Sequence, residues 1–235
     1  MALLALFGRN LEQALLANTC AFCGARIKQG ESRICEGCNA DLPWIEYACS
    51  RCASPLATEL PQGVHCAACQ QEPPPFYAAV APLAYAFPVD AAIKAMKFRR
   101  KLFYAPAFAR ILAESMQALP PGIDALLPVP LHWRRQALRG FNQAVELAGP
   151  IHEMTALPLL RNVIRVRATP YQSGLAADRR YGTLQGAFAV RGNLQARHVL
   201  IVDDVITTGE TCRQITRVLL DAGAERVSIL AIAKA

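Results

Sequence analysis

The sequence lacks long uninterrupted apolar runs. No stretch of about 18 apolar residues occurs in its 235 positions, so we expect no transmembrane span and no membrane insertion. The first residues, MALLALFGRNLEQALL, are apolar, but they have no basic start and Arg9 interrupts them, which argues against a signal peptide. Their apolar residues recur at helical spacing instead. We therefore expect an amphipathic helix over residues 1–17 and a cytoplasmic protein.

Two common phosphate-binding signatures are also absent. The dipeptide Gly-Lys of the P-loop occurs nowhere, and neither does the Gly-x-Gly-x-x-Gly fingerprint of dinucleotide-binding domains. Any anion site in this chain is therefore expected to be of another kind.

Charge is distributed unevenly along the chain. The formal net charge is +7, but residues 1–75 carry 5 Lys/Arg against 7 Asp/Glu, whereas residues 76–235 carry 20 against 11. The basic character of the larger segment favours an anionic partner such as phosphate, pyrophosphate or nucleic acid, although solvated arginines on helix faces give the same count. With 53% hydrophobic residues the chain can bury a core, and its length allows one large or two modest domains.

Eight of the nine cysteines form four Cys-x2-Cys pairs, and these are Cys20 and Cys23, Cys35 and Cys38, Cys49 and Cys52, and Cys66 and Cys69. Two such turns aim four sulfurs at one ion, so we predict two structural Zn²⁺ sites in a double zinc ribbon over residues 18–72. Disulfides are disfavoured without a secretion signal, and the run spacings of iron–sulfur clusters are missing. Consecutive and cross-braced pairing both fit the similar linkers. His65 is expected to be a bystander and Cys212 a small core residue.

The apolar patterns after the linker QQEPPP predict an α/β domain over residues 76–235. The expected elements are a hairpin in FYAAVAPLAYAF broken near Pro82, helices over 89–98 and 106–118, a strand in IDALLPVP, a long helix from Arg134 to His152, a strand in HVLIVDD, a helix over Gly209–Ala222 and a last strand in RVSILAIA. The final strand–helix–strand order predicts a parallel sheet with helices on both faces.

The stretch VLIVDDVITTGET, Val199–Thr211, places two carboxylates beside a loop suited to an anion. Ligands of open parallel sheets bind at the carboxyl ends of strands, where Asp203 and Asp204 are expected. Ionised carboxylates only accept hydrogen bonds and so suit sugar hydroxyls, while the loop and the following helix N-terminus suit a phosphate. A ribose 5-phosphate satisfies both halves. A simple helix cap with solvated aspartates explains fewer of these residues.

The same stretch resembles the loop that binds phosphoribosyl pyrophosphate (PRPP) in type I phosphoribosyltransferases. Together with LPVPLHWRRQALRGFNQAVELA, TPYQSGLAADRRYGTLQGAF and the eight cysteines, it resembles the ComF family of competence proteins over nearly the whole chain. The resemblance implies a type I phosphoribosyltransferase-like parallel sheet with helices on both faces, preceded by a small double zinc ribbon. It also implies that PRPP binds with Mg²⁺.

The resemblance assigns roles to individual residues. Asp203 and Asp204 would accept from the ribose hydroxyls and face Mg²⁺ through water. The 5′-phosphate would lie in the loop made of Val205, Ile206, Thr207, Thr208, Gly209, Glu210 and Thr211. The ligand would also meet Pro130 and Leu131 of the pyrophosphate turn, Arg139 and Asn142 of RGFNQ, and Gln172, Ser173, Arg179 and Arg180 of the mobile loop, where the two arginines are the catalytic candidates. Tyr181-Gly182-Thr183 and Trp133 depart from the family pattern.

The competence resemblance further implies handling of single-stranded DNA, with a protein of the DNA-uptake machinery as partner. The candidates for nucleic-acid binding are Lys97, Arg99, Arg100, Lys101, Arg134 and Arg135. Basic side chains interleaved with Phe103 and Tyr104 suit backbone tracking and base stacking, although a solvated basic helix face gives the same pattern. Two alternatives stay open: an active phosphoribosyltransferase with an amine or base acceptor, and a docking scaffold built on the zinc ribbons.

Overall fold

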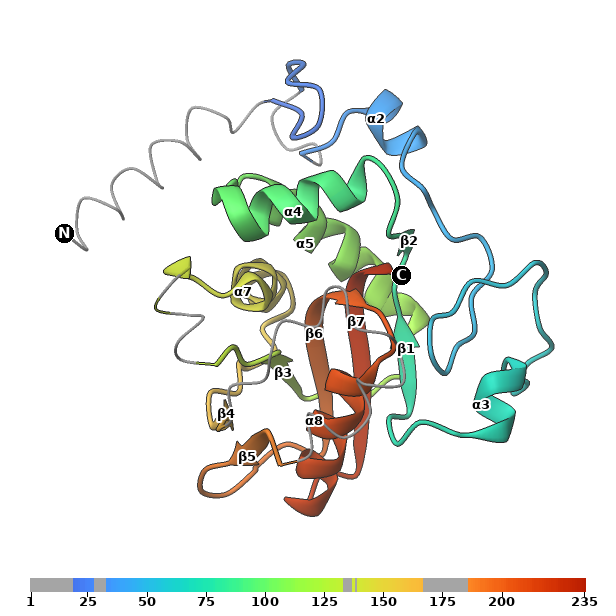
Figure 1. Ribbon diagram of the computed structural model, residues 1–235, viewed down its shortest axis with the longest axis vertical. Coiled ribbons are helices and arrows are strands. Elements are labelled where there is room, and N and C mark those ends of the chain that lie inside the picture. The colour runs from blue at the N-terminus through green and yellow to red at the C-terminus, as the bar shows by residue number, and fades with distance from the viewer. Residues whose placement is uncertain (1–18, 28–32, 133–136, 138, 167–185) are drawn as a thin grey trace.

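The centre of the protein is a parallel sheet. The computed structural model describes residues 19–27, 33–132, 137, 139–166 and 186–235. The strands follow the order β1-β7-β6-β3 (Figure 1). The two long strands, β6 (His198–Ile206) and β7 (Arg226–Lys234), lie in the middle, flanked by β1 (Ala78–Val80) and β3 (Ala125–Pro128).

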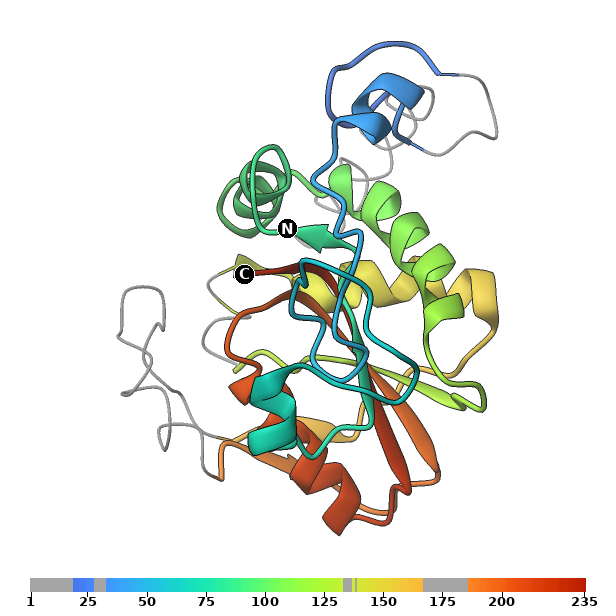
Figure 2. The ribbon, with the colours of Figure 1, turned by 90° about the vertical axis from the view of Figure 1, so that its right-hand side faces the viewer.

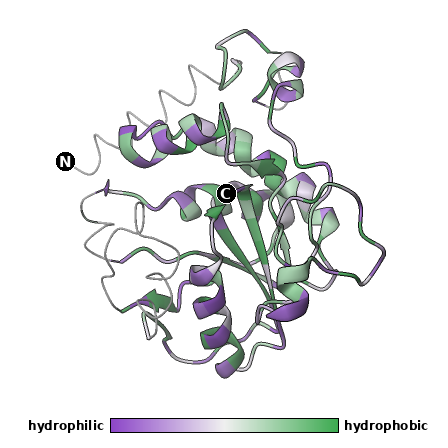
Figure 3. Ribbon diagram, turned by 45° about the vertical axis from the view of Figure 1, so that its right-hand side comes forward, coloured by the Kyte–Doolittle hydropathy of each residue, from purple (hydrophilic) through white to green (hydrophobic). Residues whose placement is uncertain are grey.

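From Val199 to Val202 the strand β6 is apolar, because both of its faces are covered there. Val199 and Ile201 pack into one hydrophobic cluster, whereas Leu200 and Val202 pack into the other. Successive side chains of a strand point to opposite faces, so an uninterrupted apolar run indicates a sheet buried on both sides. Figure 3 shows the hydrophobic colour concentrated on these central strands.

Helices cover the two faces of the sheet. On one face lie α4 (Val89–Arg99), α5 (Tyr104–Ser115), which continues into η1 (Met116–Ala118), and α7 (Gln143–Thr155); on the other lies α8 (Glu210–Asp221) (Figures 1 and 2). The antiparallel pair β4 (Val163–Arg165) and β5 (Phe188–Val190) packs on the α8 side. The predicted parallel sheet with helices on both faces is thus confirmed. In the part of the chain described, no helix is both long and apolar enough to cross a bilayer.

The predicted hairpin near Pro82 is wrong in topology. The short strand β2 (Leu83–Ala84) pairs with β7 in parallel, as β1 does, and the register offset is the same in both: Ala78 lies opposite Ser228 and Leu83 opposite Ala233. The two strands therefore run in one direction along one edge. Pro82 interrupts them because it has no N–H to contribute to the ladder.

The helix predicted from Arg134 to His152 is interrupted: residues 137 and 139 are helical, residues 140–142 are not, and α7 begins at Gln143. Gly140 has a φ of +77°, and Asn142 is extended and caps α7, with its side chain accepting a hydrogen bond from the Ala144 N–H. Both conformations are incompatible with a continuous helix, which explains the interruption. The predicted helix over residues 1–17 lies outside the described residues. Cys212 is buried in the core, as predicted.

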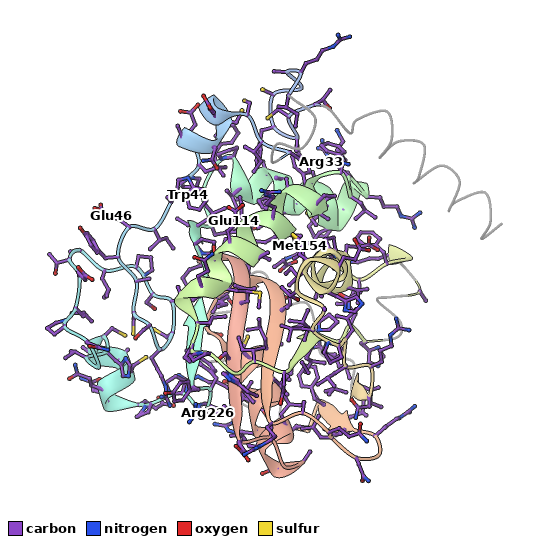
Figure 4. The ribbon with its side chains drawn as sticks, turned by 180° about the vertical axis from the view of Figure 1, so that it is seen from behind. Arg33, Trp44, Glu46, Glu114, Met154 and Arg226 are labelled. Carbon is purple, nitrogen blue, oxygen red and sulfur yellow. The ribbon has the colours of Figure 1, made fainter. Side chains whose placement is uncertain are left out.

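The segment between the two cysteine groups covers the edge formed by β1 and β2. It follows the short helix α2 (Glu36–Ala40) and precedes α3 (Ala67–Gln71). The Ile45 N–H donates to the Pro82 carbonyl at 2.9 Å, and the Ala84 N–H donates to the Pro43 carbonyl at 2.8 Å. Figure 4 labels Trp44 on this segment, where the indole N–H donates to the Asn39 carbonyl. Covering the edge prevents it from pairing with another chain.

Candidate functional site

The eight paired cysteines form two separate clusters. In each, four sulfur atoms lie within 4.8 Å of one another, and the sets are Cys20, Cys23, Cys35 and Cys38, and Cys49, Cys52, Cys66 and Cys69. Sulfur separations of 3.7 Å between Cys23 and Cys35, and of 3.6 Å between Cys52 and Cys66, fit a tetrahedral Zn²⁺ shell. The pairing is therefore consecutive, which the sequence had left open. His65 belongs to neither cluster.

The two clusters repeat the same backbone arrangement. The first cysteine of each receives an N–H from the third: Cys35 donates to Cys20 Sγ at 3.4 Å, and Cys66 donates to Cys49 Sγ at 3.3 Å. Burial opposes ionisation of these two thiols, but the backbone N–H groups outweigh it and lower the pKa of Cys20 to about 6 and that of Cys49 to about 7. Each cluster thus contains one thiol that ionises readily, and the thiolate is the form that binds a metal ion.

Each cluster is tied to a different face of the core. In the first, the Phe22 ring lies 6.0 Å from the Phe108 ring of α5 in an edge-on arrangement, and 5.5 Å from the Tyr104 ring. Near the second, Ala53 is fully buried in the cluster that packs under α8. The ribbons therefore contribute to the core instead of projecting from it.

Asp203 and Asp204 lie at the carboxyl end of β6, as predicted. Asp204 is buried, and its Oδ1 accepts a hydrogen bond from Lys97 Nζ at 2.9 Å. The Asp204 N–H donates to Asp203 Oδ1 at 2.8 Å. Lys97 was predicted as a nucleic-acid contact, but α4 carries it to this end of the sheet, where it pairs with the carboxylate.

Two cations act on the Asp203 carboxyl. Burial and the adjacent Asp204 charge raise the pKa of Asp203 to about 7, against the opposing charges of Lys97 and Arg165. Desolvation disfavours the Lys97 ammonium, yet the two aspartates raise its pKa. Arg165 was not predicted as a site residue, because it lies in a polar segment without periodicity. The pairing of β4 with β5 positions it.

The loop after the aspartates turns directly into α8. Gly209 is the N-cap of this helix and has a φ of +75°, a left-handed conformation that favours glycine. Thr207 is exposed, and the Thr208 hydroxyl accepts from the Glu210 N–H at 3.4 Å. The first turn of a helix of 12 residues presents N–H groups and a positive dipole end to an anion.

Two predicted loop contacts have another role in the structure. The Ile206 side chain is buried in the core under α8. Glu210 is also buried, and its Oε1 accepts a hydrogen bond from Gln214 Nε2 at 2.7 Å. Neither side chain is therefore available to a ligand. Val205 is half-buried against the hydrophobic cluster on the other face of the sheet, which α4, α5 and α7 cover. Thr211 is partly exposed.

Lys234 steadies the same loop, although we did not select it from the sequence. Its Nζ donates to the Thr207 carbonyl at 2.8 Å. The register of β6 and β7 places Lys234 opposite Ile206. The sequence did contain a signal for this residue. A basic residue at the carboxyl end of a parallel strand is expected at the edge of the sheet where ligands bind.

The turn after β3 is held from two sides. The Val129 N–H donates to the Val202 carbonyl at 2.9 Å, and the Val129 carbonyl accepts from Asn142 Nδ2, also at 2.9 Å. The Asn142 side chain was predicted as a ligand contact. Its amide nitrogen bonds the turn and its amide oxygen accepts from the first turn of α7, so it fastens the turn to that helix. Pro130 and Leu131 line a pocket beside the turn. Phe141 is buried.

The basic residues at the end of α4 gather near aromatic rings. The Arg139 guanidinium lies 5.5 Å from the centroid of the Phe98 ring, which is 60% exposed. The Arg100 guanidinium is 3.3 Å from the position that a Cβ on Gly140 would take, so it lies beside the same turn. Arg139, predicted to contact PRPP, therefore joins the nucleic-acid candidates in space.

Two further candidates complete this cluster. Lys101 Nζ lies 6.0 Å from the centroid of the Phe103 ring, and Arg99 is exposed. We call Phe98, Arg99, Arg100, Lys101, Phe103 and Arg139 the basic–aromatic patch. The remaining candidates lie outside the described residues, and these are Arg134, Arg135, Gln172, Ser173, Arg179 and Arg180.

Two family models match the chain in the order of its structural units. A double zinc ribbon domain matches residues 11–70, and a phosphoribosyl transferase domain matches residues 152–235. Among solved structures, the allosteric regulatory enzyme of purine biosynthesis is 22% identical, with a TM-score of 0.35 over 55% of this chain and 26% of that chain. That likeness is too partial to support a conclusion.

Two of the relatives match about nine-tenths of the chain, and a third matches a shorter part. Competence protein F of Haemophilus influenzae is 30% identical over 228 residues, which cover 92% of this chain and 96% of that protein. DNA utilization protein YhgH of Escherichia coli strain K12 is 34% identical over 220 residues, with 89% and 94% covered. Competence protein ComFC of Streptococcus pneumoniae is 29% identical over 141 residues, with 59% and 60% covered. The chain belongs to the ComF family of competence and DNA utilization proteins, and joins a double zinc ribbon to a phosphoribosyl transferase domain.

Proposed function

We propose that this protein binds PRPP, or another ribose 5-phosphate compound, at the carboxyl end of β6 and handles single-stranded DNA. The junction of β6 with α8 supports the first part. Asp203 and Asp204 offer acceptors for sugar hydroxyls, and the helix N-terminus capped by Gly209 offers N–H donors for a phosphate directly after them. One ligand with both chemistries fits this order.

Mg²⁺ is the metal expected with a diphosphate, and the donor set is compatible with it. Carboxylate oxygens are the hard ligands that Mg²⁺ prefers. Because Lys97 occupies Asp204 Oδ1, Asp203 is the carboxylate that would hold the ion, directly or through water. When bound, the ion neutralises the charge of the diphosphate, while Lys97 keeps Asp204 oriented as an acceptor.

The names of the relatives favour DNA as the second ligand, and the basic–aromatic patch has suitable chemistry. Guanidinium and ammonium groups attract the phosphate backbone, and the exposed Phe98 ring offers a face for base stacking, worth about 1–3 kcal/mol per base. Fluorescence anisotropy with a labelled oligothymidylate tests this part. We expect strongly salt-dependent binding that weakens in Arg100→Gln/Lys101→Gln, and absence of binding at low salt would refute it.

Calorimetry with PRPP and Mg²⁺ tests the phosphoribosyl site. The variant Asp203→Ala/Asp204→Ala should lose most of the affinity, whereas the control Asp221→Ala, an exposed carboxylate at the end of α8, should keep it. Equal affinity in wild type and double variant would overturn the assignment.

Two alternatives are separated by further measurements. Release of pyrophosphate from PRPP with an amine or base acceptor would make the protein an active phosphoribosyltransferase, whereas binding without turnover would favour a PRPP-binding protein. A docking scaffold predicts that removing residues 1–72 leaves PRPP binding intact. The backbone bonds from Pro43 and Ile45 to the sheet edge favour the opposite result, a destabilised core.

A further inference from the structure

A pocket of about 460 Å³ lies beside the turn after β3. Figure 1 shows β3, β4 and α7, which surround it, next to one another. Its volume falls within the range of small-molecule sites, roughly 300–1,000 Å³. The residues lining it are Pro128, Pro130, Leu131, Asn142, Val145, Leu159, Leu160, Arg161, Val163, Ile164, Arg165 and Arg191.

The charged residues of this lining are all arginines. Arg161 precedes β4, Arg165 ends β4 and Arg191 follows β5, so the antiparallel β4–β5 pair brings three arginines to the lining of one pocket. The Arg165 guanidinium also lies 5.4 Å from the centroid of the Phe188 ring of β5. The Arg191 N–H donates to the Asn162 carbonyl at 2.7 Å, which fixes the backbone there. No carboxylate lies among the described residues that line the pocket. Three fixed positive charges with planar donor groups favour an anion, and phosphate above all.

The rest of the lining is largely apolar. Leucine, isoleucine, valine and proline side chains form its wall, and Asn142 is the single neutral polar residue in the set. Leu159 bridges to Leu126 of β3, which makes this wall an extension of the sheet. A ligand that satisfies both parts carries an anionic group and a flat or apolar body. A nucleotide has this combination of a phosphate, a sugar and a planar base.

The pocket adjoins the proposed ribose site without coinciding with it. It shares the turn Pro128–Leu131, whose Val129 N–H is fastened to β6. Arg165 is close enough to Asp203 for its charge to oppose the rise in the pKa of that carboxyl. Neither aspartate nor any residue of the loop before α8 lines the pocket.

We propose that this pocket binds a nucleotide, with the guanidinium groups of Arg161, Arg165 and Arg191 receiving its phosphate and the apolar wall packing against its base or sugar. The nucleotide is either free or part of single-stranded DNA. The inference goes beyond the proposed PRPP site, although the pocket shares with it Pro130, Leu131 and Asn142.

Calorimetry with thymidine 5′-monophosphate, and anisotropy with a labelled oligothymidylate, test the proposal on the full chain in low-salt, phosphate-free buffer. Arg161→Gln/Arg191→Gln should weaken binding about a hundredfold, because two charge-assisted hydrogen bonds of about tenfold each are lost. Val145→Trp should also abolish binding, because it fills the pocket from a half-exposed position while leaving every charge in place. Arg217→Gln, an exposed arginine on α8, is the control and should bind normally.

Binding of both probes that is lost in the two pocket variants supports the proposal. If only the oligonucleotide binds and the pocket variants lose that binding, the nucleotide is part of DNA. If only the monophosphate binds and the pocket variants lose that binding, it is a free nucleotide. Wild-type affinity in either pocket variant overturns the proposal, and so does failure of the wild type to bind either probe. The PRPP measurement separates the two sites. Arg161→Gln/Arg191→Gln should keep PRPP binding, and Asp203→Ala/Asp204→Ala should keep nucleotide binding. If the arginine variant loses both PRPP and nucleotide binding, the two ligands share one site and the proposal of a separate pocket is overturned.

Discussion

Lys97 Nζ lies 2.9 Å from Asp204 Oδ1, although 107 residues separate the two in the chain. The pair joins α4, on one face of the sheet, to the carboxyl end of the central strand β6. Both side chains are mostly buried, so each depends on the other for its charge. This relationship links the stability of the fold to the chemistry of the proposed ribose site.

Replacing Lys97 tests that link. Lys97→Met should lower the free energy of unfolding by about 1–3 kcal/mol, because Asp204 is left buried without its donor. Urea denaturation of Lys97→Met, Asp204→Asn and the double variant measures the coupling between the two residues. We expect the double variant to be less destabilised than the sum of the single changes. Strict additivity would show that the ion pair contributes nothing.

Gly209 is expected to be sensitive to any side chain. Gly209→Ala should destabilise the protein by about 1–2 kcal/mol, since alanine rarely adopts the left-handed conformation seen there. The added Cβ would meet only Ile206 Cγ2 at 3.9 Å, so conformational strain and not a clash is the cause. Thermal unfolding measures the effect, with Gly37→Ala in α2 as the control. A stability equal to wild type would contradict the backbone argument, and PRPP affinity should fall along with stability.

His198 should contribute a loss of stability on mild acidification, which Asp203 opposes because the pKa of its buried carboxyl is raised to about 7. This histidine is buried, and its Nε2 lies 2.9 Å from Ser228 Oγ. Burial lowers its pKa, assisted by the charge of Arg226 and opposed by a hydrogen bond to the Pro121 carbonyl and by the charge of Asp124. The unfolded chain therefore binds a proton at about pH 6.5, where the folded protein does not, so stability is lost as the pH falls through that value.

Urea unfolding at a series of pH values checks this behaviour. His198→Gln can keep a hydrogen bond to Ser228 but cannot titrate, so its stability relative to the wild type should rise as the pH falls from about 7 to 5. An unchanged slope in the variant would assign the acid sensitivity to other groups.

Removing zinc should destabilise the whole chain. We expect two Zn²⁺ ions per chain by metal analysis and one in Cys23→Ser, with Cys212→Ser, a core cysteine outside both clusters, unchanged at two. A chelator should lower the melting temperature of the full protein, because the ribbons supply Ala53 to the core and backbone bonds to the sheet edge. An unchanged core transition after chelation would show instead that the ribbons are independent of it.

The features predicted correctly from the sequence share one property: each depends on residues close together in the chain. The cysteine spacings, the apolar run before Asp203 and the glycine after the threonines all specify local geometry, which packing then preserves. The errors have equally definite causes. Pro82 was interpreted as the break of a hairpin, but β7 is long enough to pair with both short strands in one direction, and that choice depends on a strand about 150 residues further along.

The sequence by itself determined that there would be two four-cysteine ribbons and a parallel sheet, one strand of which ends in a carboxylate pair followed by a glycine-capped turn into a helix. Short-range periodicity and turn chemistry are sufficient for these features. Only the tertiary structure decided that the cysteines pair consecutively, that Lys97 neutralises Asp204 instead of facing solvent, that Asn142 fastens a turn, and that three arginines share one pocket. These are contacts between segments distant in the chain. They depend on how helices and strands pack around a common core, which no local pattern of residues specifies.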